Sequence, residues 1–350
     1  MNDVLALARP EIRDLKPYSH AAWDPACVRL HANENPWSDH SDMEAVRLNR
    51  YPEPQPRELH AALAAYCGTS PDRVLACRGS DEAIDLLVRV FCCAGQDGVM
   101  ICPPTFAMYG FAAAVQGAAV VEVPLAVDFG LDAEAVLRIW TPDVKIVFLC
   151  SPNNPTGNLL DAGALQRVLV GLSGRALVVV DEAYFEFSHA SGAADVSSHP
   201  HLVALRTLSK AHGLAGARCG AVFAAPEIIG LLSRIIAPYA LPAPTIEAAL
   251  MALTPERLAR MQDRVRQLRA ERERLCEALG RLPCVRKVWP SEANFLLVHF
   301  EDAARAFAAA LASGLLLRDF STRPRLEGCL RITVGAPAEN DRLIACLGAA

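Results

Sequence analysis

The sequence predicts an α/β protein with a parallel or mixed sheet covered by helices on both faces, followed by a smaller α+β domain. Short apolar segments alternate with stretches of helical pattern, which is typical of a buried sheet. The chain has 350 residues, more than one compact core usually holds, and 52% of them are hydrophobic. We therefore expect an N-terminal arm that is part of the small domain (1–45), a large domain (46–245) and a small C-terminal domain (246–350).

The beginning of the chain is expected to form an extended arm. Its turn-rich segments "HANENPW" and "RYPEPQP" contain several prolines and lack helical periodicity. A helix is predicted over 57–65. A second helix is predicted to begin in "RGSDEAID", where Gly79 and Ser80 precede an acidic first turn formed by Asp81 and Glu82.

Apolar segments of strand length follow, with predicted helices between them at 132–139 and 161–172. The predicted strands span 98–102, 118–123, 145–150, 176–181 and 201–208. A long charged helix over 255–280, with apolar residues at helical spacing, is expected to lead into the second domain. There the pattern is β–β–α–β, carried by the segments "CVRKVW", "NFLLVHF", "ARAFAAALASG", "LLLRDF" and "LRITVG".

Composition and charge argue against several classes of protein. The formal net charge of −5 and a pI near 6.0, without a basic stripe, do not favour binding to nucleic acid or to an acidic membrane surface. No apolar run reaches the roughly 18 residues of a membrane span, and "MNDVLALARPEIRDLKPYSH" does not resemble a signal peptide, so we expect a cytoplasmic protein. The 12 cysteines are scattered without a C-x-x-C pair, which favours small buried side chains over a metal site.

Polar residues follow three consecutive predicted strands. Asn154 in "SPNNPTGN" follows the first of them, and Asp181 and Tyr184 in "DEAYFEF" end the second. Lys210 and Arg218 come after the third, in "SKAHGLAGARCG", where small residues allow the backbone to approach a ligand closely. Because ligands bind at the carboxyl ends of strands in open α/β sheets, we expect these side chains to meet at one rim.

Pyridoxal phosphate is a cofactor that needs such a set of groups. Lys210 would form a Schiff base with its aldehyde, and Asp181 would keep its ring nitrogen protonated. Asn154 and Tyr184 would bind its phenolic oxygen. Its phosphate would lie at the free N–H groups of a helix start, next to a cation. The predicted phosphate site comprises Ser80, Asp81, Glu82, Thr207, Ser209 and Arg218.

The ordered set of motifs resembles the fold-type I pyridoxal-phosphate aminotransferases, and among them the histidinol-phosphate aminotransferase family. The similarity runs nearly end to end, through "RLHANENPW", "RYPEPQ", "RGSDEAID", "CPPTFAMY", "SPNNPTGN", "DEAYFEF", "TLSKAHGLAGARCG", "PSEANFLLV", "GLLLRDF" and "LRITVG". This resemblance implies a large cofactor-binding domain with a mostly parallel seven-stranded sheet flanked by helices, and a smaller α+β C-terminal domain.

The resemblance also implies further roles. Tyr51 would reach the cofactor phosphate of the neighbouring subunit, in an obligate homodimer with shared active sites. Phe106 would stack on the pyridine ring, with Tyr109 as the second choice. His31 stands where this family usually has asparagine. The implied substrate-binding residues, in which the two arginines bind the substrate anion, are Tyr18, Asn33, Tyr109, Asn294, Arg318 and Arg331. Tyr18, Tyr109 and Asn294 fit packed structural residues equally well.

The implied reaction is amino transfer from L-histidinol phosphate to 2-oxoglutarate, which gives imidazole acetol phosphate and L-glutamate in histidine biosynthesis. Two enzymes of the same subgroup remain open as alternatives: an aminotransferase of aromatic amino acids and a threonine-phosphate decarboxylase. A further alternative is a regulatory module that binds the cofactor without turnover. That module would need a fused DNA-binding domain, for which we expect no room before the first strand-like segment.

Overall fold

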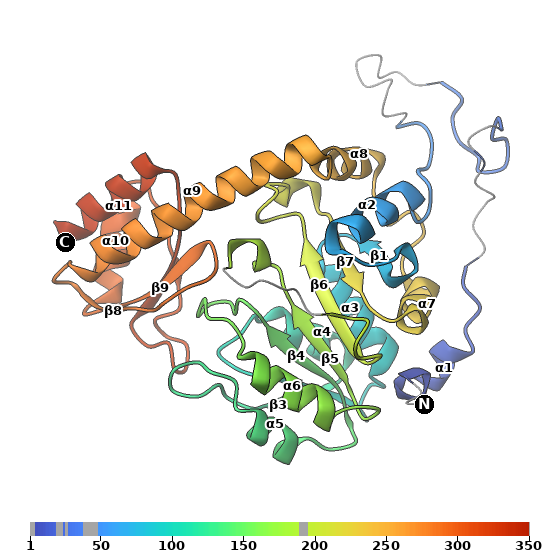
Figure 1. The fold of residues 1–350 in the computed structure, drawn as a ribbon, viewed down its shortest axis with the longest axis horizontal. Coiled ribbons are helices and arrows are strands. Elements are labelled where there is room, and N and C mark those ends of the chain that lie inside the picture. Colours follow the sequence, from blue (N-terminus) through green and yellow to red (C-terminus); the bar gives the residue numbers. More distant parts are fainter. Residues whose placement is uncertain (1–3, 19–23, 25–26, 38–47, 189–194, 350) are drawn as a thin grey trace.

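The computed structural model describes residues 4–18, 24, 27–37, 48–188 and 195–349, and it contains two sheets (Figure 1). The strands of the larger sheet are β1 (Val74–Cys77), β2 (Gly98–Ile101), β3 (Ala119–Glu122), β4 (Val144–Cys150), β5 (Leu177–Asp181), β6 (Leu202–Thr207) and β7 (Gly220–Phe223). Their order across the sheet is β1-β7-β6-β5-β4-β2-β3. Strand β7 is antiparallel to both of its neighbours, whereas the other pairs are parallel.

Apolar side chains point to both faces of the central strands, which explains why helices cover both faces of this sheet. Val178 and Val180 of β5 belong to one apolar cluster and Val179 to the other, and Val147 and Phe148 of β4 divide in the same way. The first face is covered by α2 (Arg57–Cys67), α5 (Ala133–Ile139), α6 (Ala162–Gly171) and α8 (Ala243–Ala252). The second face is covered by α3 (Ser80–Phe91), α4 (Met108–Gln116) and α7 (Pro226–Ile235).

The long helix α9 (Pro255–Gly280) connects the two sheets and runs from α8 to the small domain (Figure 1). The small sheet is antiparallel, in the order β10-β11-β9-β8. Leu275 and Leu279 of α9 are buried in the core of this domain. Its elements are β8 (Val285–Val288), β9 (Phe295–Phe300), α10 (Ala303–Ala312), β10 (Arg318–Asp319), β11 (Cys329–Thr333) and α11 (Pro337–Gly348). The remaining short helices are η1 (Val4–Leu7), α1 (Pro10–Arg13), η3 (Pro71–Arg73), η4 (Phe185–Phe187) and η5 (Ala215–Ala217).

The predicted fold class is confirmed, and the predicted strands of the large sheet agree closely with those observed. The segment 201–208, for example, is β6 (Leu202–Thr207). Strands β1 and β7 were missing from the predicted segments, although β2 and β3 are equally short and were predicted. Helices α4, α7, α8 and α11 were not predicted either, and "LLLRDF" contributes two strand residues. The division at 45/46 and 245/246 stays a prediction.

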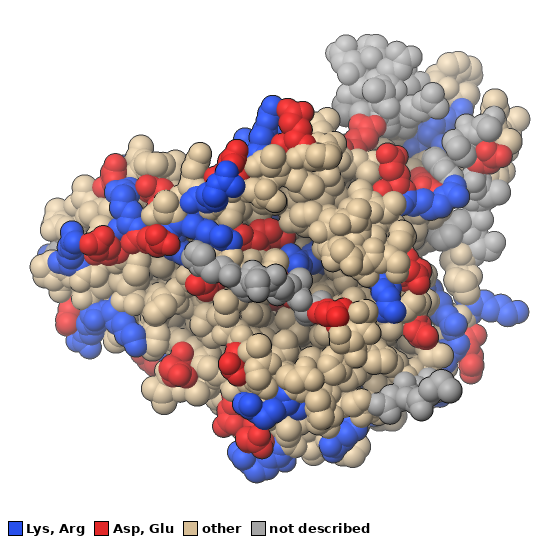
Figure 2. Space-filling view, viewed as in Figure 1, with Lys and Arg blue, Asp and Glu red and all other residues tan. Residues whose placement is uncertain are grey.

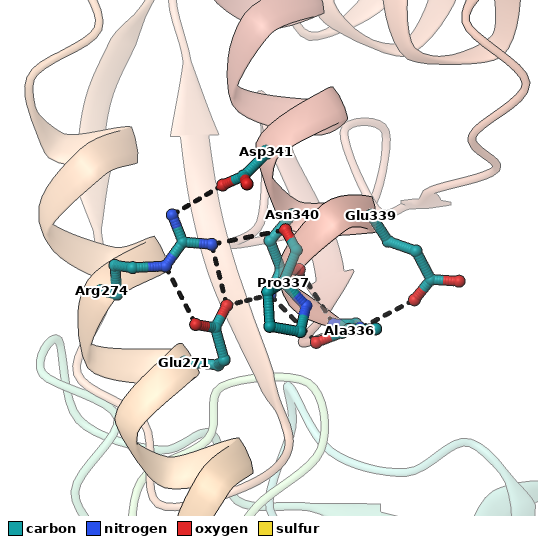
Figure 3. A network of polar contacts seen from close by, with 8 residues as sticks. Glu271, Arg274, Ala336, Pro337, Glu339, Asn340 and Asp341 are labelled. Carbon is teal, nitrogen blue, oxygen red and sulfur yellow. Dashed lines mark hydrogen bonds and ion pairs between the residues drawn. The ribbon is translucent and has the colours of Figure 1, made fainter.

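A polar network fixes the loop after β11 against α9 (Figure 3). The buried Asn340 donates to the Glu271 carboxylate (2.9 Å) and to the Gly335 carbonyl (3.0 Å), and its Oδ1 accepts from the Gly335 N–H (3.0 Å). Arg274 holds the same Glu271 carboxylate at 2.9 Å and 3.0 Å. The fixed loop directly follows β11, the strand that carries Arg331.

Charged side chains of both signs lie side by side over the face shown in Figure 2, without a large area of one sign. Such a mixed surface gives no electrostatic footprint for nucleic acid on this face. Among the helices formed by the described residues, none combines the length and the apolar character that crossing a bilayer requires.

We expect Asn340→Ala to lower the free energy of unfolding by about 1–3 kcal/mol, because it removes the side-chain partner of both polar groups of Gly335. Urea denaturation measures the change. The matched control is Asp341→Ala, which removes a surface ion pair with Arg274 (2.8 Å) and should cost clearly less, because solvent screens an exposed ion pair. Equal losses in the two variants would contradict the structural role given to Asn340.

Candidate active site

Three neighbouring strand ends assemble the candidate site. In the parallel register, Cys150 of β4 lies beside Asp181 of β5, and Asp181 lies beside β6. The loops that follow β4 and β6 therefore bring Asn154 and Lys210 to the edge where Asp181 ends its strand. Nδ2 of Asn154 lies 3.5 Å from the Tyr184 hydroxyl, and Nζ of Lys210 lies 5.5 Å from the centre of the Tyr184 ring. The structure thus brings together the residues that the sequence placed at one rim.

Asp181 is 2% exposed and has donors on both carboxylate oxygens. Oδ1 accepts from the N–H of Ala183 (3.1 Å), and Oδ2 accepts from the hydroxyl of Tyr109 (2.9 Å). Burial raises the pKa of Asp181 to about 6, and the two hydrogen bonds oppose that rise. A carboxylate this far from water favours a positively charged partner, such as a protonated ring nitrogen.

Asn154 joins the two domains at the site. Its Nδ2 faces the Tyr184 hydroxyl, and its Oδ1 accepts a hydrogen bond from the guanidinium of Arg331 in β11. Tyr184 packs edge to face against Phe295 of β9 (ring centres 5.1 Å apart), and the Arg331 guanidinium lies 5.2 Å from the same ring. Residues of the small sheet therefore complete the rim of the large sheet.

Lys210 is exposed at this rim. Partial loss of hydration, and then the nearby positive charge of Arg331, lower the pKa of its ammonium. A lowered pKa makes the neutral amine available closer to neutral pH. This is what a lysine needs if it is to act as a nucleophile and as a base.

The start of α3 and Arg218 form an anion site. A Cβ built on Gly79, whose φ is +79°, would lie 3.0 Å from Nη2 of Arg218, so the guanidinium rests directly on this glycine. Arg218 also pairs with Asp81 (3.0 Å). The N–H groups of the first helical turn, from Ser80 to Glu82, have no intrahelical partner. Such N–H groups next to a guanidinium suit a phosphate.

The other predicted phosphate ligands differ in which of their donor groups are available to bind a phosphate. The Glu82 carboxylate accepts from the N–H (2.7 Å) and Nε (2.8 Å) of Arg78, so its own backbone N–H is the group left for an anion. Thr207 is buried, and its Oγ lies 3.0 Å from Oγ of Ser209 and accepts from the Ser209 N–H (3.2 Å). Their contact with a phosphate stays a prediction.

Tyr109 is buried next to the site. Its side chain is 0% exposed and stacks on Phe148, with ring centres 4.8 Å apart and planes 3° from parallel. The substrate contact and the second stacking choice that the resemblance implies for Tyr109 stay predictions. Phe106 meets Tyr109 edge to face at 5.7 Å and is half-buried. Its stacking on a cofactor ring stays a prediction.

Arg318 and Arg331 face each other across the β10–β11 pair. Burial, together with the charge of Arg318, lowers the pKa of Arg331. In the part of the chain that the structure describes, neither guanidinium has a carboxylate as ion-pair partner. Two adjacent cations without an acid between them suit an oxyanion ligand. Asn294, directly before β9, is half-buried, and its carbonyl accepts from the N–H of Val334 (2.9 Å).

Three residues with predicted roles, Tyr18, Asn33 and Tyr51, lie on or just after the N-terminal arm, which follows α1 in Figure 1, and so does His31, which was given no role. Tyr18 is 67% exposed, and His31 and Asn33 are exposed as well. Tyr51 stacks on Tyr239, with ring centres 4.5 Å apart. The roles given to these arm residues stay predictions.

A buried ion cluster behind the site was not predicted. Arg206 of β6 binds Glu182 (2.8 Å) and Glu186 (3.0 Å), and Tyr66 donates to Glu186 (3.1 Å). The cluster ties the turn after β5 to the strand that leads to Lys210. A signal was present in the sequence, because a charged residue interrupts an otherwise apolar strand segment and two glutamates follow Asp181 in "DEAYFEF".

The donor set fits pyridoxal phosphate. The buried carboxylate suits a ring nitrogen, the adjacent amide and phenol suit a phenolic oxygen, and an amine with a lowered pKa suits an aldehyde. The phosphate is matched by the helix start and guanidinium at Gly79, where a side chain would meet Arg218.

The family model for "Aminotransferase class I and II" matches residues 18–347. The chain belongs to this family. This aminotransferase is 49% identical over 356 aligned residues to the histidinol-phosphate aminotransferase of Stenotrophomonas maltophilia (strain R551-3), which covers 100% of this chain and 98% of the relative. It is 47% identical to the histidinol-phosphate aminotransferase of Aeromonas salmonicida (strain A449), over 97% of each chain. The resemblance inferred from the motifs is thereby confirmed.

Solved structures agree with this assignment. The histidinol-phosphate aminotransferase of Sinorhizobium meliloti, solved in complex with pyridoxal-5'-phosphate, has a TM-score of 0.80 and 26% identity over 88% of this chain and 84% of that one. L-threonine-O-3-phosphate decarboxylase of Porphyromonas gingivalis has a TM-score of 0.73 and 26% identity, over 89% and 95% of the two chains. The predicted fold type is confirmed. The near-complete coverage by enzymes favours an aminotransferase over the regulatory module.

Asp181→Asn should raise the stability of the cofactor-free aminotransferase at neutral pH. The folded pKa of about 6 exceeds the unfolded value of 3.8, so ionising Asp181 costs stability as pH rises through this window. At pH 7.5 we expect the variant to be more stable by an amount on the order of 3 kcal/mol, and the difference to vanish near pH 4. Urea denaturation at a series of pH values measures this. A difference that does not depend on pH would show that the Asp181 charge is not the cause.

Proposed function

We propose that this aminotransferase transfers the amino group of L-histidinol phosphate to 2-oxoglutarate, giving imidazole acetol phosphate and L-glutamate, with pyridoxal phosphate bound through Lys210. The observation that carries the proposal is the pair Arg318 and Arg331, which is connected through Asn154 to Tyr184 at the cofactor end of the site. The names of the relatives at 49% and 47% identity support the same reaction.

The residues around Lys210 supply acid–base chemistry. When bound, pyridoxal phosphate supplies the carbonyl that takes up the amino group and the electron sink that stabilises charge on the substrate Cα. Once the substrate amine has displaced it, Nζ of Lys210, with its lowered pKa, would accept the proton that leaves Cα and donate it to the carbon that the cofactor's aldehyde provides. Asp181 would supply the negative charge that pairs with the protonated ring nitrogen, and Tyr184 and Asn154 would hold the phenolic oxygen.

The two arginines explain how one site takes two dissimilar substrates. L-Histidinol phosphate has no α-carboxylate but carries a phosphate, whereas 2-oxoglutarate and L-glutamate carry carboxylates. A guanidinium presents a planar fork of donors that binds either oxyanion with two hydrogen bonds. Arg331 is fixed by Asn154, and Arg318 is exposed and able to adjust.

The proposal includes a homodimer in which Tyr51 of one subunit contributes to the phosphate site of the other. On the arm, Val28 is 83% exposed and Leu30 is 90% exposed, which favours burial against a second surface. The arm also has internal structure next to Tyr51. Glu34 accepts from the Tyr51 N–H (2.7 Å) and pairs with Arg50 (3.0 Å). These two contacts hold the backbone at Tyr51 in place. A cytoplasmic location stays a prediction.

A half-reaction screen tests the substrate. The visible absorbance of the bound cofactor is followed after adding L-histidinol phosphate, phenylalanine or threonine phosphate to the holoenzyme. We expect fast loss of absorbance with L-histidinol phosphate and a rate slower by about tenfold or more with the others, because their anions or side chains fit less well. Lys210→Ala is the control, and it should carry no cofactor mass after borohydride reduction. Fast reaction with phenylalanine alone would overturn the substrate, and labelling of Lys210→Ala would overturn the lysine.

Hybrid dimers test the shared site. Tyr51→Phe and Lys210→Ala subunits are mixed, and we expect activity to reappear because one of the two sites in each hybrid regains both residues. With random mixing, roughly a quarter of the native sites is restored if each site takes Tyr51 from one subunit and Lys210 from the other. The measurement is glutamate formation at equal subunit ratio. A mixture no more active than the parent proteins would argue against a site shared in this way.

A further inference from the structure

The hydroxyl of Tyr109 is placed to act on the carboxylate of Asp181. The phenol lies 2.9 Å from Oδ2, and both side chains are buried. The Tyr109 ring has little freedom, because it stacks on Phe148 at 4.8 Å and meets the edge of Phe106 at 5.7 Å. Its position in the first turn of α4 is therefore determined by packing on two sides, and its hydroxyl reaches the carboxylate without a water in between.

The contact favours the ionised form of Asp181. A phenol donates to a carboxylate, and the donated hydrogen bond is lost or weakened when the carboxyl takes up a proton. Burial raises the pKa of Tyr109 well above its usual value, so it stays neutral and remains a donor. Without this hydroxyl, Oδ2 would lose its protein donor while Oδ1 kept the N–H of Ala183. The cost of keeping a buried negative charge would then rise.

We infer that Tyr109 is a positioning residue that holds the Asp181 carboxylate in place and favours its ionised form. It thereby determines whether the proton shared between Asp181 and the cofactor rests on the ring nitrogen or on the carboxylate. The inference rests on the proposed function, because it takes Asp181 as the partner of that nitrogen. Phe106 and Tyr109 lie three residues apart, at the start of α4. The start of this helix would therefore act both on the face of the ring, through Phe106, and on the carboxylate that pairs with the ring nitrogen, through Tyr109.

Tyr109→Phe tests the inference in the holoenzyme loaded with pyridoxal phosphate that carries a ¹⁵N label in the ring. The nitrogen resonance reports directly whether the ring is protonated. We expect the unmodified protein to show the protonated position from about pH 6 to about pH 9. In Tyr109→Phe the resonance should move toward the neutral position over the whole range, because the proton now rests partly on Asp181. We also expect kcat to fall about tenfold or more with KM changed less than about threefold.

Two further variants separate the possible outcomes. Tyr66→Phe removes another half-buried phenol that donates to a carboxylate, that of Glu186, and should leave the nitrogen resonance unchanged. Asp181→Asn removes the charge itself and should give the neutral position. If Asp181→Asn shifts the resonance and Tyr109→Phe does not, the inference about Tyr109 is overturned while the proposed function stands. If Asp181→Asn leaves the ring protonated, the role of Asp181 in the proposed function fails.

A purely structural role for Tyr109 would lower the melting temperature without moving the nitrogen resonance, and that result would also overturn the inference. If Tyr109→Phe does not yield folded protein, Phe148→Leu provides the second test. It removes the ring on which Tyr109 stacks but keeps the hydroxyl. The resonance should then move in the same direction by a smaller amount, and an unchanged resonance would contradict the positioning role.

Discussion

The carboxylate of Asp181 ends a central strand at a depth that water does not reach, and much of the site is arranged around it. An ionised group at such a depth is unfavourable unless donors and a cation surround it. Tyr109 and the N–H of Ala183 supply the donors. These two donors are neutral, so a positively charged partner at the rim, where Lys210 lies, would further stabilise the carboxylate. The same physical constraint that makes the carboxylate costly in the fold makes it a strong partner for a cationic ring.

The small domain completes this arrangement from the other side. Arg331 reaches across to Asn154, and Phe295 supports the ring of Tyr184. Helix α9 holds the two domains at this point, because the buried Arg272 donates to the carbonyl of Ala293 (3.0 Å) before β9 and to that of Phe187 (3.2 Å) after β5. The substrate anion site and the cofactor site are therefore parts of one connected structure, and a change in the angle between the domains would act on both.

The sequence predicted those helices and strands whose residue pattern is set by burial along the segment itself. Buried strands need continuous apolar segments, and a helix with one buried side needs apolar spacing, so most of the large sheet and the whole of α9 were visible as patterns. Strand ends in a parallel sheet share one edge, so Asn154, Asp181 and Lys210 were expected to meet. Strands β1 and β7 were not predicted; they pair with each other at the edge of the sheet, and that pairing joins segments far apart in the chain.

By itself, then, the sequence determined the fold class, the order of the motifs and the kind of chemistry, because each depends on residues that are close in the chain. The tertiary structure alone decided which polar groups touch. It placed the hydroxyl of Tyr109 on Asp181, and it set Arg318 opposite Arg331. It also gathered Glu182 and Glu186 around Arg206. Such contacts join residues far apart in sequence, and their geometry follows from how the helices and strands pack, which no local pattern records.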